Sequence, residues 1–218
     1  MKNQGGNAVV IILIAVALFA ALTFTLSRSV QDGESNELTR AQTEIYASQL
    51  MSYAAEVESA ISQMLYSGAE IDDLDFVLPD DTDFETGSDI YKVFHPDGGG
   101  VNLKRLPEGV IAQVSATTPA DWYLDRFNNV EWTPTTKMDV ILTAHQIAKS
   151  TCEEINKVIT GSRTIPALND SLSNILVAGN AESDLDETAC SDCEGYASLC
   201  VSNVSVNAWS FYTIVAAQ

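Results

Sequence analysis

The densest group of potential metal ligands lies in an acidic stretch, residues 69–99. Four of its acids follow one another closely: Asp81, Asp83, Glu85 and Asp89. Carboxylate oxygens held close together are the ligands that Ca²⁺ requires, so these acids form a candidate calcium site. The spacing is not that of an EF-hand loop, because Thr86 separates Glu85 from Gly87. The alternative is a solvated acidic loop that holds no ion, and no other cofactor is expected.

The cysteines suggest a second kind of chemistry, and all lie in the last third of the chain: Cys152, Cys190, Cys193 and Cys200. An even number of cysteines in an exported domain predicts two disulfides, and the three possible pairings remain open. The alternative is a four-thiolate zinc site, since Cys190 and Cys193 have half of the usual ligand spacing. A second such pair is missing, which favours the disulfides.

Neither histidine stands in a recognisable catalytic setting. His95 lies in a glycine-rich turn, and His145 is expected on the exposed side of a helix. Gly98, Gly99 and Gly100 are not followed by the Gly-Lys-Ser/Thr of a phosphate-binding loop, so turn formation explains them better. No nucleophile beside a base, no acid/base pair and no cofactor motif stands out, and we therefore do not expect an enzyme.

The elements that must position these residues begin with an uncharged apolar run from Ala8 to Leu26. As a helix, this run would be about 30 Å long, the thickness of a bilayer's hydrocarbon core. A cleaved secretory signal is the alternative, but the run is long and no small-residue cleavage site follows it. Lys2 precedes the run and acids begin at Asp32. We therefore expect a retained single-pass inner-membrane helix, with the amino end in the cytoplasm and the acidic body outside.

After the apolar run the pattern stays helical and becomes amphipathic. Apolar residues recur on one face, with later steps of three and four: Leu38, Ala41, Ile45, Leu50, Tyr53, Val57, Ile61 and Met64. Gly68 is a natural C-cap for this segment. Residues 8–67 are therefore expected to form one long helix or two nearly collinear helices.

The rest of the chain predicts one head domain of mixed structure. Short strands are expected at Ile90–Phe94, Val101–Lys104, Val110–Ser115, Val201–Val206 and Trp209–Ala216. One further helix is expected from Thr136 to Thr160, ended by Gly161. The fold class is α+β: a long amino-terminal helix, apolar and then amphipathic, followed by a globular head of antiparallel strands with one further helix. Four divisions of the chain are expected. Residues 1–6 are a leader-like segment, 7–31 the transmembrane or assembly helix, 32–67 its amphipathic continuation and 68–218 the exported acidic head.

The charge of the chain restricts its partners. Lys and Arg number 11 against 30 Asp and Glu, which gives a formal net charge of −19. Nucleic acid is excluded as a partner, because binding it needs clustered Lys and Arg against phosphates. A charge of this size keeps an exported domain soluble and attracts divalent cations.

The order of these elements, with the short leader Met1–Gly6 before the apolar run, resembles the type IV pilins and pseudopilins over residues 1 to about 67. The resemblance implies cleavage by a leader peptidase after Gly6, so that Asn7 becomes the amino terminus. The glutamate that the family usually carries four residues further on is absent, and Ile11 stands there. The segment Tyr91–Gly100 is also similar to a motif of uncharacterised bacterial proteins, which implies no activity.

The resemblance implies a structural subunit of a cell-surface filament or secretion pseudopilus. Such a subunit would associate with copies of itself, with the membrane and with an assembly machinery. The assembly helix would include Ala8, Ile12, Ala15, Phe19 and Leu22. The alternative function is a monomeric, membrane-anchored envelope protein whose head binds a partner or Ca²⁺.

Overall fold

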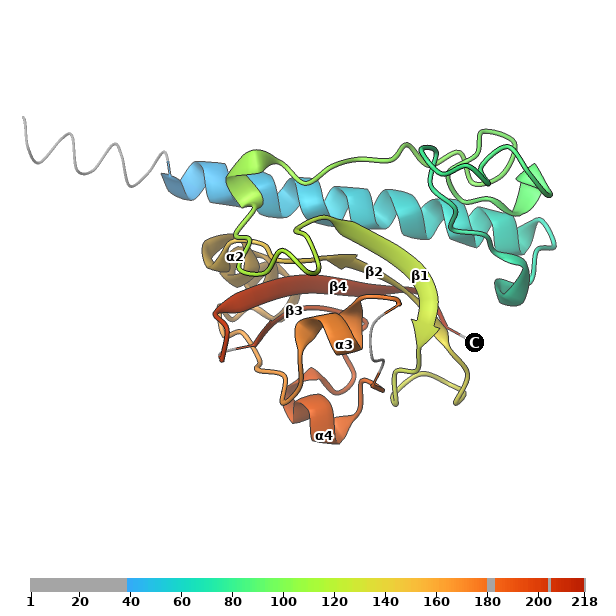
Figure 1. Ribbon diagram of the computed structural model, residues 1–218. Coiled ribbons are helices and arrows are strands. Elements are labelled where there is room, and N and C mark those ends of the chain that lie inside the picture. Colours follow the sequence, from blue (N-terminus) through green and yellow to red (C-terminus); the bar gives the residue numbers. More distant parts are fainter. Residues whose placement is uncertain (1–38, 180–182, 204, 218) are drawn as a thin grey trace, which may run out of the picture. The chain divides into compact units, whose positions relative to one another are not determined.

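The computed structural model describes residues 39–179, 183–203 and 205–217. The chain divides into two compact units, Met1–Gln42 and Thr43–Gln218. Of the first unit only residues 39–42 are described, so the fold in Figure 1 is essentially that of the second unit. It combines helices with an antiparallel sheet of four strands, which confirms the α+β class.

A long helix occupies residues 39–66 and turns one apolar stripe toward the core. The buried stripe consists of Ala47, Leu50, Tyr53, Ala54, Val57, Ile61 and Met64. Steps of three and four residues place these side chains on one face, as predicted from Leu50 onward. The prediction is wrong for the first turns, where Ala41 is exposed and the Ile45 side chain is 54% exposed. Leu38 lies outside the described residues.

The carboxyl end of this helix is closed by Gly68, as predicted. Gly68 has a φ of 105°, a left-handed conformation that glycine adopts without steric cost. Its N–H donates to the carbonyl of Leu65, and the N–H of Ala69 donates to the carbonyl of Met64. These two hydrogen bonds form a Schellman cap, which satisfies carbonyls of the last helical turn and turns the chain away.

The sheet has the strand order β1-β2-β4-β3, and all neighbouring strands are antiparallel. Its strands are β1 (Trp122–Asn128), β2 (Asp139–Ala144), β3 (Ser198–Asn203) and β4 (Ala208–Ala216). Tyr123 pairs with Thr143 across β1 and β2, and Cys200 pairs with Phe211 across β3 and β4. The two strands predicted at the carboxyl end, Val201–Val206 and Trp209–Ala216, are thus confirmed, although the first lies earlier, at Ser198–Asn203.

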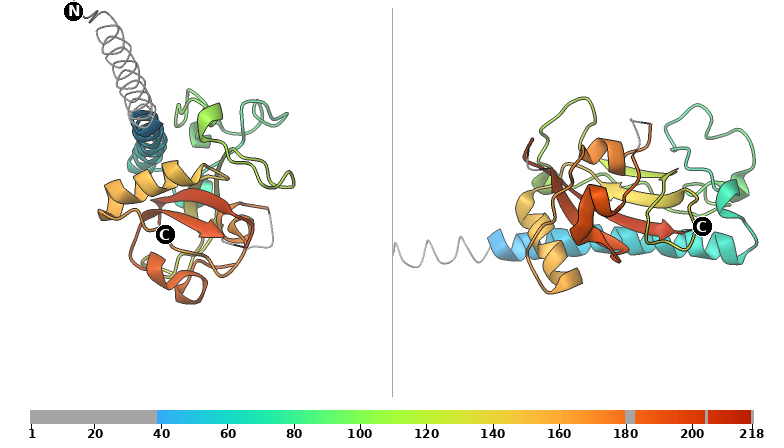
Figure 2. Two further views of the ribbon diagram at one scale, coloured as in Figure 1. Left: turned by 90° about the vertical axis from the view of Figure 1, so that its left-hand side faces the viewer. Right: turned by 90° about the horizontal axis from the view of Figure 1, so that it is seen from below.

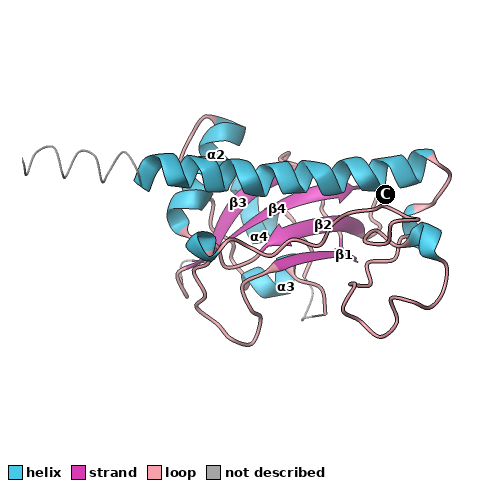
Figure 3. Ribbon diagram, turned by 90° about the horizontal axis from the view of Figure 1, so that it is seen from above, coloured by secondary structure: helices cyan, strands magenta, loops and turns pink. Residues whose placement is uncertain are grey.

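The sheet separates two apolar cores, because successive side chains of a strand point to opposite faces. In β2, Leu142 joins the core under helix residues 43–66, whereas Ile141 joins the core on the other face. Phe211 and Tyr212 of β4 alternate in the same way. Figures 2 and 3 show the long helix over one face of the sheet, and Figure 1 shows α3 (Leu172–Leu176) and α4 (Glu187–Cys190) on the other.

The predicted helix Thr136–Thr160 is correct only in its second half. The structure has β2 at Asp139–Ala144 and a helix, α2, at Lys149–Thr160. All side chains of β2 are buried, because the strand lies in the middle of the sheet with a core on each face. Helix α2 ends at Gly161, whose φ is 79°, as predicted.

The three strands predicted between residues 90 and 115 are wrong. Residues 89–91 form a 3₁₀ turn, residues 101–104 have no regular structure, and Ile111 makes only an isolated bridge to Ile147. Strand pairing there is limited, among the described residues, to isolated bridges such as that of Lys92 with Asp75, so no ladder forms. Strand β1, at the edge of the sheet, was not predicted.

Candidate functional site

The acids predicted to bind calcium do not gather into one site. Asp81, Asp83 and Glu85 are exposed, and Asp81 accepts a hydrogen bond from the N–H of Leu78 through Oδ2. Asp89 instead turns toward Lys92 and His95. Among the described residues, one group of potential ligands is close enough to hold a metal, and Asp89 is the only predicted acid in it. Calcium binding at the four acids stays a prediction.

Lys92 is the buried centre of this region and is 0% exposed. Its ammonium group donates to Oδ1 of Asp89 at 2.7 Å and to the carbonyl of Phe84, and it lies 5.7 Å from the centre of the Phe84 ring. The hydrogen bond from Lys92 holds the pKa of Asp89 below its ordinary value, and the nearby His95 lowers it further. The buried cation therefore fixes both the acidic loop at Phe84 and the start of the glycine-rich turn.

The potential ligand group consists of Asp89, His95 and Asp97, whose ligand atoms lie within 4.8 Å of one another. The N–H of Asp97 donates to Nδ1 of His95 at 3.2 Å, so in the neutral ring the proton is on Nε2. Nε2 lies 3.8 Å from Oδ2 of Asp89. A protonated Nε2 has no lone pair for a metal, and Ca²⁺ prefers oxygen ligands. The geometry suits a hydrogen-bonded turn better than a metal centre.

Each position of the triple-glycine segment requires glycine, either because a Cβ would clash or because φ is positive. A Cβ on Gly98 would lie 2.2 Å from the carbonyl oxygen of Lys92, and a Cβ on Gly99 would lie 2.5 Å from that of Val93. Gly100 has a φ of 65°. The N–H groups of all three donate to carbonyls of Lys92 or His95, so they are engaged within the turn. This arrangement supports turn formation and leaves no cradle of N–H groups for a phosphate.

His145 is buried, which corrects the prediction that it is exposed on a helix. It follows the last residue of β2 and is 4% exposed, and its Nδ1 lies 3.0 Å from the Oγ of Ser210. Burial lowers the pKa of His145 to about 4, so the ring is neutral near pH 7. Ser210 is 0% exposed, and no substrate reaches a serine sealed in this way. The pair is therefore a structural contact between β2 and β4.

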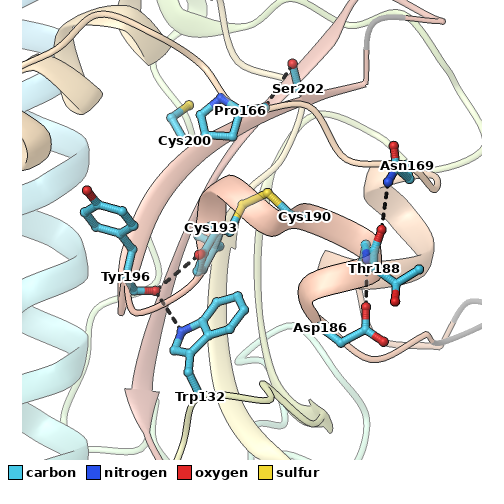
Figure 4. Close-up of a disulfide and its surroundings, with 12 residues drawn as sticks. Trp132, Pro166, Asn169, Asp186, Thr188, Cys190, Cys193, Tyr196, Cys200 and Ser202 are labelled. Atoms are coloured by element: carbon cyan, nitrogen blue, oxygen red, sulfur yellow. Dashed lines mark hydrogen bonds between the residues drawn. A yellow bond between two sulfur atoms is a disulfide. The ribbon is translucent and has the colours of Figure 1, made fainter.

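The cysteines form two disulfides, Cys152–Cys200 and Cys190–Cys193, which resolves the pairing left open by the sequence. The first ties α2 to β3 across 48 residues, and the second closes a turn after α4. Near the second disulfide, Tyr196 donates its N–H to the carbonyl of Cys193 and accepts from Nε1 of Trp132 (Figure 4). The zinc alternative is wrong, because no thiolate remains.

The predicted leader and assembly residues lie outside the described part of the chain: Gly6, Asn7, Ala8, Ile12, Ala15, Phe19 and Leu22. Within residues 39–217, apart from the gaps, no helix has the length and apolarity needed to cross a membrane. This finding contradicts the predicted location as a single-pass inner-membrane protein with an external head, and that prediction is corrected. The run Ala8–Leu26, on which it depended, is not among the residues searched.

Comparison with known proteins gives no relative: no protein family, no curated protein and no solved structure matches this chain.

Sequence reasoning overlooked the role of Lys92, although a signal was present. Lys92 is the one lysine or arginine in the acidic stretch 69–99, and the apolar residues Val93 and Phe94 follow it. A lysine is buried only when it is paired, and this base has many acids near it in sequence with which to pair.

Proposed function

We propose that the chain is a structural, non-catalytic subunit of a pilin-like filament or secretion pseudopilus. Its copies associate through the apolar run Ala8–Leu26, and its acidic head is displayed on the assembly. In a filament, the apolar runs bury their surfaces against one another, and small residues such as Ala15 permit close approach. A leader peptidase that cuts after Gly6 and an assembly machinery are the partners of this proposal.

The observation that carries the proposal is the order of elements along the chain. An amphipathic helix at 39–66 is followed by four antiparallel strands and two late disulfides, which is the order that the resemblance to pilins implies. The helix is not an appendage, because Leu50, Val57 and Ile61 are buried in the same core as Phe211 of β4. Any force on the helix is therefore transmitted to the sheet.

The buried histidine adds support for a non-catalytic role. His145 and Ser210 are in hydrogen-bond contact, yet both are sealed from solvent. The alternative of a monomeric membrane-anchored protein is not carried forward, since it depends on the location corrected above.

The proposal is tested on the full-length chain produced with and without a pilin leader peptidase. Mass spectrometry should find a mature chain that begins at Asn7 when the peptidase is present, and negative-stain microscopy should then show fibres. Ala15→Asp should abolish the fibres, because a carboxylate in the apolar run opposes helix contact. Ser205→Asp, an exposed change in the β3–β4 turn, is the matched control and should leave them intact. An uncleaved chain that forms no fibres would exclude the proposal.

A further inference from the structure

Strand β1 is the open edge of the sheet, whereas the opposite edge is covered. On β3, the N–H and carbonyl of Cys200 bond to the amide of Asn156, and those of Ser202 bond to residues 166–168. On β1, the N–H of Trp122 bonds to Asp121 Oδ1 at 2.9 Å, and that of Arg126 bonds to Asp125 Oδ1 at 2.7 Å. Figure 3 shows β1 at the outer side of the sheet.

Leu124 lies between these two capped positions and presents its backbone outward. In an antiparallel strand, alternate residues direct their N–H and C=O away from the neighbouring strand. The N–H groups of Trp122 and Arg126, which bond to side chains and not to β2, point outward. Leu124 is two residues from each of them, so its N–H and C=O point outward as well. Among the described residues, Leu124 has no hydrogen-bond partner outside the sheet. The middle of β1 therefore offers a donor and acceptors to an added strand.

A groove lies beside this edge, and two arginines tie residues 71–80 to β1 and to the residue before it. Arg126 donates to the carbonyl of Ile71 and to Asp72, both at 2.8 Å, and Arg105 bridges Asp121 to Asp80. Between these bridges lies a hollow of about 660 Å³. Its apolar lining includes Leu74, Phe76, Leu78, Leu103 and Leu124.

The charges that line the groove indicate which kind of peptide would bind there. Among the described residues that line it are three acids, Asp75, Asp121 and Asp125, and one base, Arg105. The chain as a whole carries a net charge of −19. Leu124 and Trp122 face the core of the long helix, so Asp121 and Asp125 lie on the other face of β1. An added strand would thus place apolar residues on the first face and basic residues on the second.

We propose that the β1 groove binds an extended peptide segment of another protein, in which apolar residues alternate with Lys or Arg. The segment adds a strand to β1 through the backbone of Leu124, and its basic side chains contact the acids of the groove. A second copy of this chain is a poor occupant, because its surface is itself acidic.

The binding is measured by fluorescence anisotropy with the full-length chain and a labelled, blocked peptide of alternating Lys and Val. Saturable binding is expected, with no binding of the Glu/Val analogue and none of a Lys/Val analogue whose outward amides are N-methylated. Asp125→Asn keeps the oxygen that caps Arg126 and removes the charge, and should weaken binding about three- to tenfold. Asp192→Asn, an exposed change outside the groove, is the matched control and should leave binding unchanged.

Leu124→Pro tests the backbone directly. It removes an outward N–H from an edge strand, where proline is tolerated, and should abolish binding, whereas Leu124→Ala should retain it. If Leu124→Pro fails to fold, the N-methylated peptide decides the same question. Equal binding of the N-methylated or the Glu/Val peptide, or no binding of any peptide, overturns the proposal. A dimer of the chain alone that Leu124→Pro abolishes would assign the edge to a second copy and also overturn it.

Discussion

At the residue scale, two buried bases show how this head accommodates groups that prefer water. Lys92 lies inside the protein with a carboxylate, a carbonyl and an aromatic ring around the end of its side chain. His145 has a serine hydroxyl beside it instead, and burial lowers its pKa to about 4. A charge inside a protein needs an opposite charge or it is given up, and the two residues illustrate both outcomes.

The neutral His145 predicts a loss of stability in acid. Its pKa is about 4 in the folded chain and about 6.5 unfolded, so the unfolded chain binds the extra proton. The stabilisation is complete above pH 6.5 and is lost as the pH falls toward 4. Between pH 7 and pH 5 the loss should be about 2 kcal/mol in the free energy of unfolding, measured by urea denaturation.

The control for this prediction is His145→Asn, which keeps a polar group near Ser210 and cannot titrate in this range. Carboxylates also bind protons as the pH falls, so the histidine's share is the difference between the two slopes. Equal slopes in the original chain and in His145→Asn would show that His145 does not couple folding to pH.

At the element scale, the same apolar residues serve a strand where a helix was expected. Ile141 and Ala144 are spaced as on a helical face that continues to Ala148, but the continuous apolar run 140–142 also fits a strand buried on both faces. The choice between them is made by β1 and β4, which bond to β2 from either side. By contrast, the hairpin of β3 and β4 was predictable, because its two strands are neighbours in sequence and are joined by a short turn.

The two disulfides predict unequal contributions to stability. A crosslink that closes a longer loop removes more freedom from the unfolded chain. Replacing Cys152 and Cys200 by alanine, across a separation of 48 residues, should cost about 4 kcal/mol. Replacing Cys190 and Cys193, separated by 3, should cost about 2 kcal/mol. Urea denaturation of the two double variants measures both losses.

Reductant provides the control for these variants. In the Cys152/Cys200 alanine variant, reductant should cause only the smaller loss, because only Cys190–Cys193 remains to be broken. If the ranking of the two double variants is reversed, strain or contacts in the folded chain outweigh loop closure.

At the scale of the whole molecule, charge opposes the proposed assembly. Copies that each carry −19 repel one another, and the apolar runs must overcome this repulsion. Raising the ionic strength from about 0.01 M to 0.15 M shortens the range of the repulsion from about 30 Å to about 8 Å. We therefore expect more of the chain to pellet as fibres at the higher salt. The Ala15→Asp variant should not pellet at either salt concentration. A smaller amount of fibre at the higher salt would contradict the prediction and would indicate ionic contacts between heads.

The sequence by itself determined the features that are encoded locally. The apolar stripe from Leu50 to Met64, its end at Gly68, the end of α2 at Gly161 and the last hairpin all follow from spacing, or from the conformational freedom of glycine. The candidate site was located only in part: the acidic stretch and the glycine-rich turn were recognised as segments, without the contacts between them.

The tertiary structure alone decided the features that join distant residues. It paired Cys152 with Cys200, placed Asp139–Ala144 in the middle of a sheet, and set segment 71–80 beside the open edge of β1. It also explains why residues 98 and 99 must be glycine. Backbone atoms of Lys92, Val93 and Asp89 fold back against them and leave no room for a Cβ. Local patterns cannot specify such contacts, because they depend on which segments the packed core brings together.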